Sequence, residues 1–255
     1  MWTIRQDQAE AFRRHHLQKF EDEMVEHLKK FAPQHCRAAG EPAVRRVIRM
    51  GIENAGRYGF TNRGPVRFYI ELMFMFGSYF DTDPQYPWAT TALNDLTYRD
   101  QMRRADRLFR AMNRYGAQVR GPNNRHLIEA LNLLSQTKAE EVANSTDSLE
   151  ESAIQRLYAI YPETCKYLGE PALRGLVRDS FEIARSYGLT TVKGMLLMVA
   201  FTIFVGHRFP VDPLYPWIGK RLEAGRGSDP EARTEELHTK ATLYLRHALA
   251  EKAKG

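Results

Sequence analysis

Two stretches of the chain, residues 36–88 and 165–217, are versions of one sequence. The first opens as Cys36-Arg-Ala-Ala-Gly-Glu-Pro-Ala43, and the second opens as Cys165-Lys-Tyr-Leu-Gly-Glu-Pro-Ala172. At a constant offset of 129 residues and without a gap, 19 of 53 positions are identical. Self-similarity at a fixed period is the signature of a repeated structural unit. The sequence therefore predicts a tandem duplication.

Proline, glycine and apolar spacing divide each copy into helices. A first helix is expected to end near Pro33 or Pro162. Gly-Glu-Pro then opens a second helix, because proline in a first turn sacrifices no hydrogen bond. We expect Gly59 and Gly188 to end this helix in the left-handed conformation. In the first copy the apolar positions recur at helical spacing, at Val44, Val47, Ile48, Ile52 and Ala55.

A third helix, rich in Phe, Leu and Met, leads in each copy to the motif Asp-Pro-x-Tyr-Pro-Trp. Two prolines within four residues forbid helix there and stiffen the turn. Tyr and Trp in such a turn are typical of a plug at the end of a core. The motif comprises Asp83, Pro84, Tyr86, Pro87 and Trp88 in the first copy and Asp212, Pro213, Tyr215, Pro216 and Trp217 in the second.

No segment shows the period-two alternation of strands. The expected fold is all-α, a tandem duplication of a four-to-five-helix unit arranged as a pseudo-twofold helical bundle. We expect an N-terminal unit over residues 1–134, a connection over 135–150 and a C-terminal unit over 151–255. The first unit carries an extra N-terminal helix, whose apolar positions are Ala11, Phe12, Leu17, Phe20, Met24 and Leu28. Long amphipathic helices close the units, from about Tyr98 to Tyr115 and from Ser228 towards Ala250.

Composition indicates a globular cytoplasmic protein. The chain has 255 residues, of which 43% are hydrophobic and 27% charged. Its longest uncharged apolar run, residues 194–206, falls short of the roughly 20 residues that a bilayer requires, so we interpret it as a buried helix. The N-terminus lacks the apolar run of a secretory signal. Cys36 and Cys165 have no metal or redox spacing and are expected to be reduced thiols, and no metal or cofactor is expected.

Basic residues concentrate in one segment. Residues 99–125 hold eight arginines against Asp100 and Asp106, although the whole chain has a formal charge of only +6. Five of the arginines fall on one arc of a helical wheel: Arg99, Arg103, Arg107, Arg110 and Arg114. We call them the Arg stripe. It is interpreted either as a partner-binding face for an anionic surface or as the solvated side of an amphipathic helix.

A second charged pattern occurs in both copies with i, i+4, i+8 spacing. It consists of Arg45, Arg49 and Glu53 in the first copy and Arg174, Arg178 and Glu182 in the second. Such a ladder is typical of a structural ion network, which we expect to reach Asp83 and Asp212. A catalytic site or an anion-binding site is the alternative interpretation. A further alternative is a catalytic pair of carboxylates among Asp81, Asp83 and Asp212.

Two segments resemble a known group of proteins. Residues 76–89 (FGSYFDTDPQYPWA) and the opening Ile4-Arg5-x-x-Gln8-x-x-x-Phe12 are similar to uncharacterised helical proteins of Gram-negative bacteria encoded beside type VI secretion spike and effector genes. The resemblance covers mainly residues 1–95. It implies an accessory role in effector handling, or a soluble domain of an effector module.

These observations favour a non-enzymatic interaction protein, an adaptor or chaperone-like factor for a type VI secretion effector or spike component. The partner is then another protein. An effector (toxin) domain of unrecognised chemistry and an immunity protein are the alternatives. Nucleic-acid binding through residues 99–125 is less favoured, and no membrane span is expected.

Overall fold

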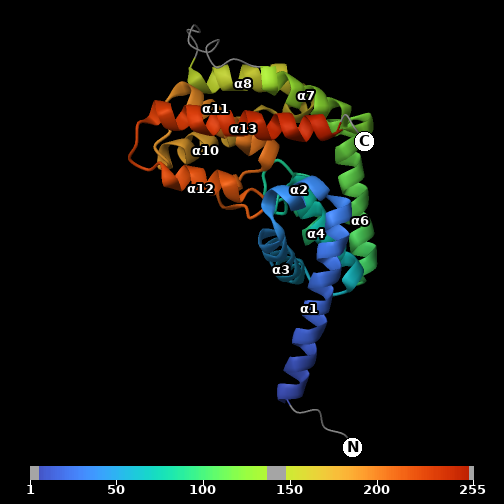
Figure 1. Ribbon diagram of the computed structural model, residues 1–255. Coiled ribbons are helices and arrows are strands. Elements are labelled where there is room, and N and C mark those ends of the chain that lie inside the picture. Colours follow the sequence, from blue (N-terminus) through green and yellow to red (C-terminus); the bar gives the residue numbers. More distant parts are fainter. Residues whose placement is uncertain (1–5, 137–147, 253–255) are drawn as a thin grey trace, which may run out of the picture.

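The structure, a computed structural model, describes residues 6–136 and 148–252, and their regular elements are all helical (Figure 1). The predicted all-α class is confirmed. The first half contains α1 (Gln6–Phe31), α2 (Pro33–Ala39), α3 (Glu41–Arg57), α4 (Arg63–Phe76), α5 (Pro87–Asn94), α6 (Gln101–Tyr115), the π-helical turn η1 (Gly116–Arg120), the short turn η2 (Pro122–Asn124) and α7 (Arg125–Gln136). The second contains α8 (Leu149–Ile160), α9 (Pro162–Leu168), α10 (Glu170–Ser186), α11 (Val192–Val205), the short turn η4 (Phe209–Val211), α12 (Pro216–Ala224) and α13 (Pro230–Lys252).

Helices α2 to α6 each have a counterpart, α9 to α13, that begins 129 residues later. Gly59 and Gly188 adopt positive φ angles of 73° and 71°, as predicted for the ends of α3 and α10. One expectation was incomplete: Pro33 and Pro162 follow the end of a helix but also open the short helices α2 and α9. A proline at the first helical position accounts for this, since that position needs no N–H donor.

The two halves lie against each other with their helices in different directions (Figure 1). Helices α8, α10, α11, α12 and α13 stack across the upper part, and α1, α3, α4 and α6 form the lower part. Helix α7 belongs by sequence to the predicted N-terminal unit, yet it packs against α8 and α13. Of the predicted connection over 135–150, residues 137–147 lie outside the described residues, and α8 already begins at Leu149.

Two buried carboxylates join the halves reciprocally. Asp212 accepts hydrogen bonds from the amide N–H (2.8 Å) and the hydroxyl (2.5 Å) of Ser78, directly after α4. Asp83 accepts from the amide N–H of His207 (2.9 Å), at the equivalent place after α11. Each carboxylate also accepts from an amide in its own turn, Leu214 for Asp212 and Gln85 for Asp83. Burial raises the pKa of Asp212, and the hydrogen bond from Ser78 opposes that shift. Each half therefore binds the backbone that directly follows a helix of the other.

Glycines allow this close approach. Gly77, between α4 and Ser78, has a φ of 94°, and a Cβ atom there would lie 2.7 Å from the carbonyl oxygen of Val205. Gly206, at the equivalent position, has a φ of 121°. Only glycine adopts such conformations without strain. The ends of α4 and α11 can touch because neither glycine has a side chain.

The Asp-Pro-x-Tyr-Pro-Trp turns carry the predicted aromatic plug. In the first half Tyr86 and Trp88 are buried, and their rings meet Tyr115 at centroid distances of 5.6 and 5.8 Å. In the second half Tyr215 and Trp217 meet Tyr244 in the same manner, at 6.3 and 5.8 Å. Each turn thus anchors the last long helix of its half.

Both halves also bury an arginine that the sequence analysis did not single out. Arg104 of α6 donates to the carbonyl oxygen of Leu93 (2.9 Å), where α5 ends. Arg233 of α13 donates to the carbonyl oxygen of Leu222 (2.8 Å) near the end of α12. These bonds satisfy carbonyl groups that a helix end leaves without partners.

The Arg–Arg–Glu ladder forms ion pairs, but the expected connection to Asp83 and Asp212 was wrong. Arg45 and Arg49 instead bind Glu21, whose carboxylate is 8% exposed, at 3.0 and 2.8 Å. Glu53 pairs with Arg57. In the second half Arg174 and Arg178 bind Glu150, and Glu182 pairs with Arg185. The ladder therefore fastens α3 to α1 and α10 to α8.

Helix α1 packs along only part of its length. Phe20, Met24 and Leu28 lie against or within the core, as predicted. Phe12 and Leu17 are exposed, contrary to the expectation that they belong to a packed apolar face. The reason is visible in Figure 1, where the N-terminal part of α1 extends beyond the neighbouring helices.

The substitution Gly77→Ala should destabilise the protein by about 3 kcal/mol, because it adds both backbone strain and overlap with Val205. Gly56→Ala is the matched control: Gly56 lies within α3, and nothing occupies the space around its Cβ position. That change should be neutral or stabilising by about 0.5–1 kcal/mol. Urea unfolding of both variants checks the prediction, and equal midpoints would contradict the close approach.

The ion pairs of Glu21 with Arg45 and Arg49 predict that the stability of the protein depends on pH. The hydrogen bond from Arg49 lowers the pKa of Glu21 below its ordinary value of 4.5. The resulting stabilisation is present above pH 4.5 and is lost as the pH falls through the lower, folded-state pKa. Glu21→Gln should cost about 1.5 kcal/mol at pH 7, and the difference from wild type should shrink at pH 3. Glu26→Gln, an exposed position on the same helix, should change the urea midpoint little at either pH.

Candidate functional site

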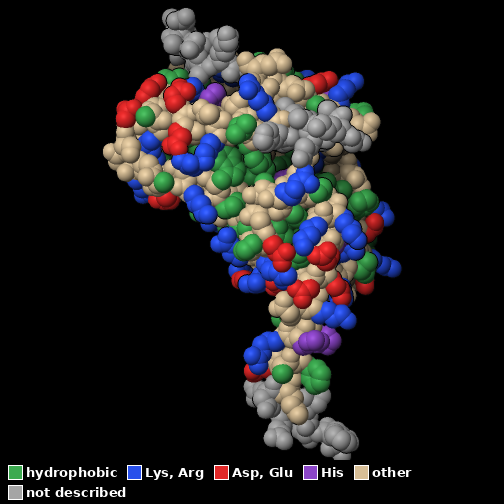
Figure 2. Space-filling view, in the orientation of Figure 1, with side chains coloured by type: hydrophobic (Ala, Val, Ile, Leu, Met, Phe, Trp, Pro, Cys, Tyr) green, Lys and Arg blue, Asp and Glu red, His purple; other side chains and the backbone are tan. Residues whose placement is uncertain are grey.

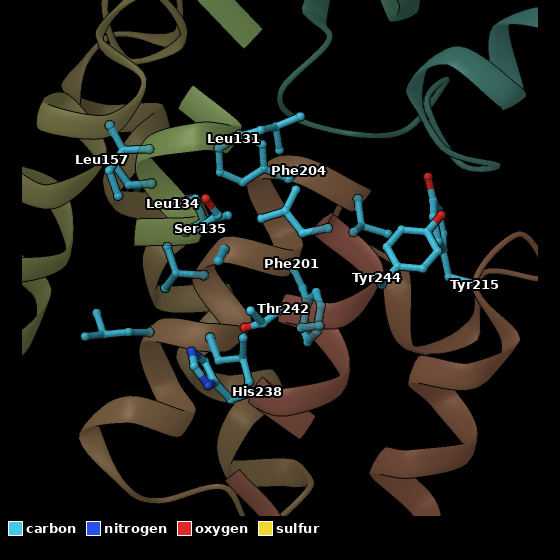
Figure 3. A pocket seen from close by; sticks show the side chains of 18 of the residues that line it. Leu131, Leu134, Ser135, Leu157, Phe201, Phe204, Tyr215, His238, Thr242 and Tyr244 are labelled. Atoms are coloured by element: carbon cyan, nitrogen blue, oxygen red, sulfur yellow. The ribbon is translucent and has the colours of Figure 1, made fainter. Parts of the chain in front are cut away.

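A large apolar groove opens in the second half, with a volume of about 570 Å³. Its walls come from α7, α8, α11 and α13, and α2 of the first half contributes a further edge. Figure 3 shows Leu131 and Leu134 of α7 near Leu157 of α8, with Tyr215 and Tyr244 together at one side and His238 apart from them. The volume lies within the range of pockets that hold small molecules or side chains of a partner.

Helix α11 supplies the floor of the groove. Its sequence, Val192–Val205, is apolar around its whole circumference, which the sequence analysis interpreted as a buried helix. That interpretation holds for one side, where Met198 and Ile203 are buried. The other side lines the groove, where Leu196, Ala200 and Phe204 are only partly buried. The uncharged apolar run over residues 194–206, on a helix that is not fully covered, was the sequence signal for this site.

The polar side chains that line the groove are basic or neutral. Arg37, Arg156 and Lys193 come from three different helices, and His238 comes from a fourth. No Asp or Glu is among the lining side chains of the described residues. Burial lowers the pKa of His238, and Lys193 lowers it further, whereas Glu235 opposes the shift. In Figure 2 apolar side chains gather between the second-half helices and α2, with Lys and Arg around them. Of these side chains, Lys193 already forms an ion pair with Glu235.

At the corresponding place in the first half, the chain covers the end of α4. There η1 turns back after α6, so that Val119 is fully buried and the guanidinium of Arg120 lies 4.2 Å from the ring centroid of Phe76. Arg120 also donates to the carbonyl oxygen of Met75 (2.8 Å). The equivalents of Met75 and Phe76 are Phe204 and Val205, and both line the open groove. In the second half α13 continues as a helix where α6 gives way to η1.

One wall of the groove is the junction between the halves. His35 of α2 lies 3.3 Å from the hydroxyl oxygen of Tyr215, and its ring packs against Tyr215 and Phe74. Burial lowers the pKa of His35. Tyr215 thus belongs both to the predicted Asp-Pro-x-Tyr-Pro-Trp motif and to the groove. Among the residues predicted as sites, it is the one that lines the cavity.

The Arg stripe lies elsewhere, on the exposed side of α6. Arg107 pairs with Asp95 and Arg110 with Asp106, while Arg103 and Arg107 lie over the ring of Tyr98. Part of the stripe is therefore engaged locally, and its role as a partner-binding surface stays a prediction. On α6, Ala105 and Leu108 are buried, whereas Met102 and Phe109 are exposed.

The carboxylates and thiols of the described residues show no arrangement that identifies a catalytic or metal site. Asp83 and Asp212 each accept several hydrogen bonds in the junction between the halves, where both are buried. Cys36 and Cys165 are free thiols. Across residues 6–136 and 148–252, His, Cys, Asp and Glu form no cluster of three that could hold a metal ion. In the same ranges no helix has the length and apolarity needed to cross a membrane.

Comparison of the chain with protein families, with curated proteins and with solved structures finds no match. The resemblance to proteins encoded beside type VI secretion genes therefore stays a prediction from the sequence. The groove is the feature on which a functional hypothesis can be built.

Both cysteines should resist modification in the folded protein. Burial raises the pKa of the Cys36 thiol, and it raises that of Cys165 to about 12. Because the thiolate is the reactive form, Cys165 in a Cys36→Ser variant should react with a disulfide reagent at pH 8 only as fast as the protein unfolds. The denatured variant provides the control and should react at once. Rapid reaction in the native state would instead indicate an activated nucleophile.

Proposed function

We propose that this protein is a non-enzymatic interaction protein, which holds an apolar segment of a partner protein in the groove of its second half. The observation that carries the proposal is the contrast between the halves. In the first half Arg120 lies over Phe76 at the end of α4, whereas in the second half the equivalent end of α11 lines an open groove. Partly exposed apolar side chains gathered in one groove are characteristic of binding sites.

The more specific form of the proposal is an adaptor or chaperone-like factor for a type VI secretion effector or spike component, acting in the cytoplasm. It rests on the resemblance of residues 76–89 and of the N-terminal segment. The Arg stripe would assist by steering an acidic partner towards the protein, since complementary charge raises the rate of encounter.

We also infer that the chain arose by tandem duplication of one helical unit. Contacts that recur 129 residues apart support this inference. They include the reciprocal bonds of Asp83 and Asp212 and the buried Arg104 and Arg233.

The test is co-purification from the cells that encode the protein, at low and at moderate salt, with partners identified by mass. Ala200→Trp fills the groove from its floor. Ala159→Trp is the matched control, because Ala159 is exposed on α8 and does not line the groove. We expect one stoichiometric partner with wild type and with the control, and its loss with Ala200→Trp.

Two results would contradict the proposal. The first is retention of the partner by Ala200→Trp, which would place the binding surface outside the groove. The second is the absence of any partner at either salt concentration, which would favour an autonomous activity of the chain. Circular dichroism of each variant establishes that the substitution leaves the helical fold intact.

A further inference from the structure

Helix α6 presents apolar and basic side chains next to each other on its exposed surface. Met102 and Phe109 are 57% and 48% exposed. They stand seven residues apart, so they lie on the same face of the helix, two turns from each other. Each is followed directly by an exposed arginine, Arg103 or Arg110. An apolar residue beside a basic one therefore recurs with a period of seven along the outer edge of the lower part of the molecule (Figure 1).

The apolar surface of α6 continues onto α4, which packs against it. The ring of Phe109 meets the ring of Phe68 edge to face, at a centroid distance of 5.9 Å. A Cβ atom on Gly64 would lie 3.6 Å from the sulfur of Met102, so these two residues are neighbours across the helices. Met75, seven residues after Phe68, is exposed as well. Exposed apolar side chains shared by two packed helices are typical of a contact surface for another protein.

Most arginines of the Arg stripe are available to a partner. Arg99 and Arg114 are exposed, and neither forms an ion pair with another described residue. The guanidinium of Arg103 contacts an aromatic ring and pairs with no carboxylate of the described residues. Arg110 has an ion pair within α6, but both side chains of that pair are largely exposed, so it is weak and can be exchanged. Arg107 alone is held by a carboxylate outside α6. The surface therefore has a positive charge that the acidic side chains of a partner can neutralise.

The helical scaffold does not require this pattern. Helix α13 is the counterpart of α6, and its buried Arg233 recurs at the position of Arg104. The exposed pairs do not recur. At the positions of Met102, Arg103, Phe109 and Arg110, α13 has Glu231, Ala232, His238 and Thr239. The alternation of apolar and basic residues thus belongs to the exposed surface of α6 and not to the packing that both halves share.

We propose that α6 is a second interaction surface, which binds an acidic α-helix of a partner protein. In coiled-coil packing, apolar residues with a period of seven meet those of the partner helix, and the charged residues beside them select the partner. An added helix would place apolar side chains against Met102 and Phe109. Its Asp or Glu side chains would then lie beside Arg103, Arg110 and Arg114. This inference goes beyond the function proposed above, in which the Arg stripe only raises the rate of encounter, and it does not depend on the groove.

Two other anionic partners fit this surface less well. Nucleic acid presents an uninterrupted row of phosphates, whereas the exposed carboxylates of Asp100 and Asp106 lie among the arginines. A bilayer surface is bound by apolar side chains that project into it, whereas the ring of Phe109 packs sideways against Phe68 of α4. A helix with acidic residues at selected positions avoids both conflicts.

The experiment measures the binding of two labelled helical peptides to the full-length protein by fluorescence anisotropy. Each peptide spans three heptads and carries Leu once per heptad; one has Glu and the other Lys on both sides of each Leu. We expect the Lys peptide to bind at least about tenfold more weakly than the Glu peptide.

Two double variants test the arginines. Arg103→Glu with Arg114→Glu removes no ion pair of the described residues, and it should weaken binding of the Glu peptide about tenfold, a change of about 1.4 kcal/mol. Arg46→Glu with Lys220→Glu is the matched control, because it changes the net charge equally at exposed positions of α3 and α12. It should leave the affinity unchanged.

Three single variants test the apolar contact and its location. Phe109→Ala should weaken binding of the Glu peptide, whereas Leu243→Ala, which removes an exposed apolar side chain from the counterpart helix α13, should not. Ala200→Trp fills the groove and should also leave peptide binding unchanged. Circular dichroism of each variant establishes that the helical fold is intact.

Several outcomes would overturn the inference. Binding of the Glu peptide that survives the change of Arg103 and Arg114 but is lost with Ala200→Trp would place the helix in the groove. Equal binding of both peptides, or binding of neither, would exclude an acidic helix as the partner of α6. If neither peptide bound, but phosphatidylglycerol vesicles or single-stranded polythymidine bound through Arg103 and Arg114, the surface would be assigned to a membrane or to nucleic acid. None of these results decides whether the groove captures a partner, which the co-purification with Ala200→Trp tests separately.

Discussion

The junction between the halves depends on a reciprocal exchange of hydrogen bonds. Asp212 holds the backbone after α4, and Asp83 holds the backbone after α11. Both carboxylates are buried, and a buried carboxylate without donors is strongly destabilising. The exchange therefore fixes the relative position of the halves, and through Tyr215 it also fixes the edge of the groove that lies against α2.

Much of the helical order could be predicted from local chemistry. Gly59 and Gly188 end helices because their positive φ angles are easy for glycine, and Asp229 caps α13 through the amide of Ala232. The groove could not be predicted in the same way. It depends on whether the chain after Tyr115 turns back, and the residues that form the turn have no counterpart in the repeated block. The sequence analysis identified Asp83 and Asp212 as part of the repeated motif. Their hydrogen-bond donors are mainly backbone amides, which a pattern of side chains does not predict.

The comparison of the halves shows how one scaffold supports two surfaces. The aromatic plug, the buried arginine and the ion pairs between helices recur in both halves. What differs is the path of the chain at the end of the last long helix. A break at α6 places Arg120 over the end of α4, whereas α13 continues as a helix and the equivalent end of α11 lines the groove. The two halves share most of their contacts and differ in the path of the backbone at the end of the last long helix.

The position of the capping residues along the chain bears on how the protein is made. Ser78 follows the end of α4, yet its acceptor Asp212 lies 134 residues later. During synthesis the first half therefore emerges before the acceptor of Ser78 and before the amide of His207 that donates to Asp83. Its final packing is reached only when the turn containing His207 and Asp212 has left the exit tunnel.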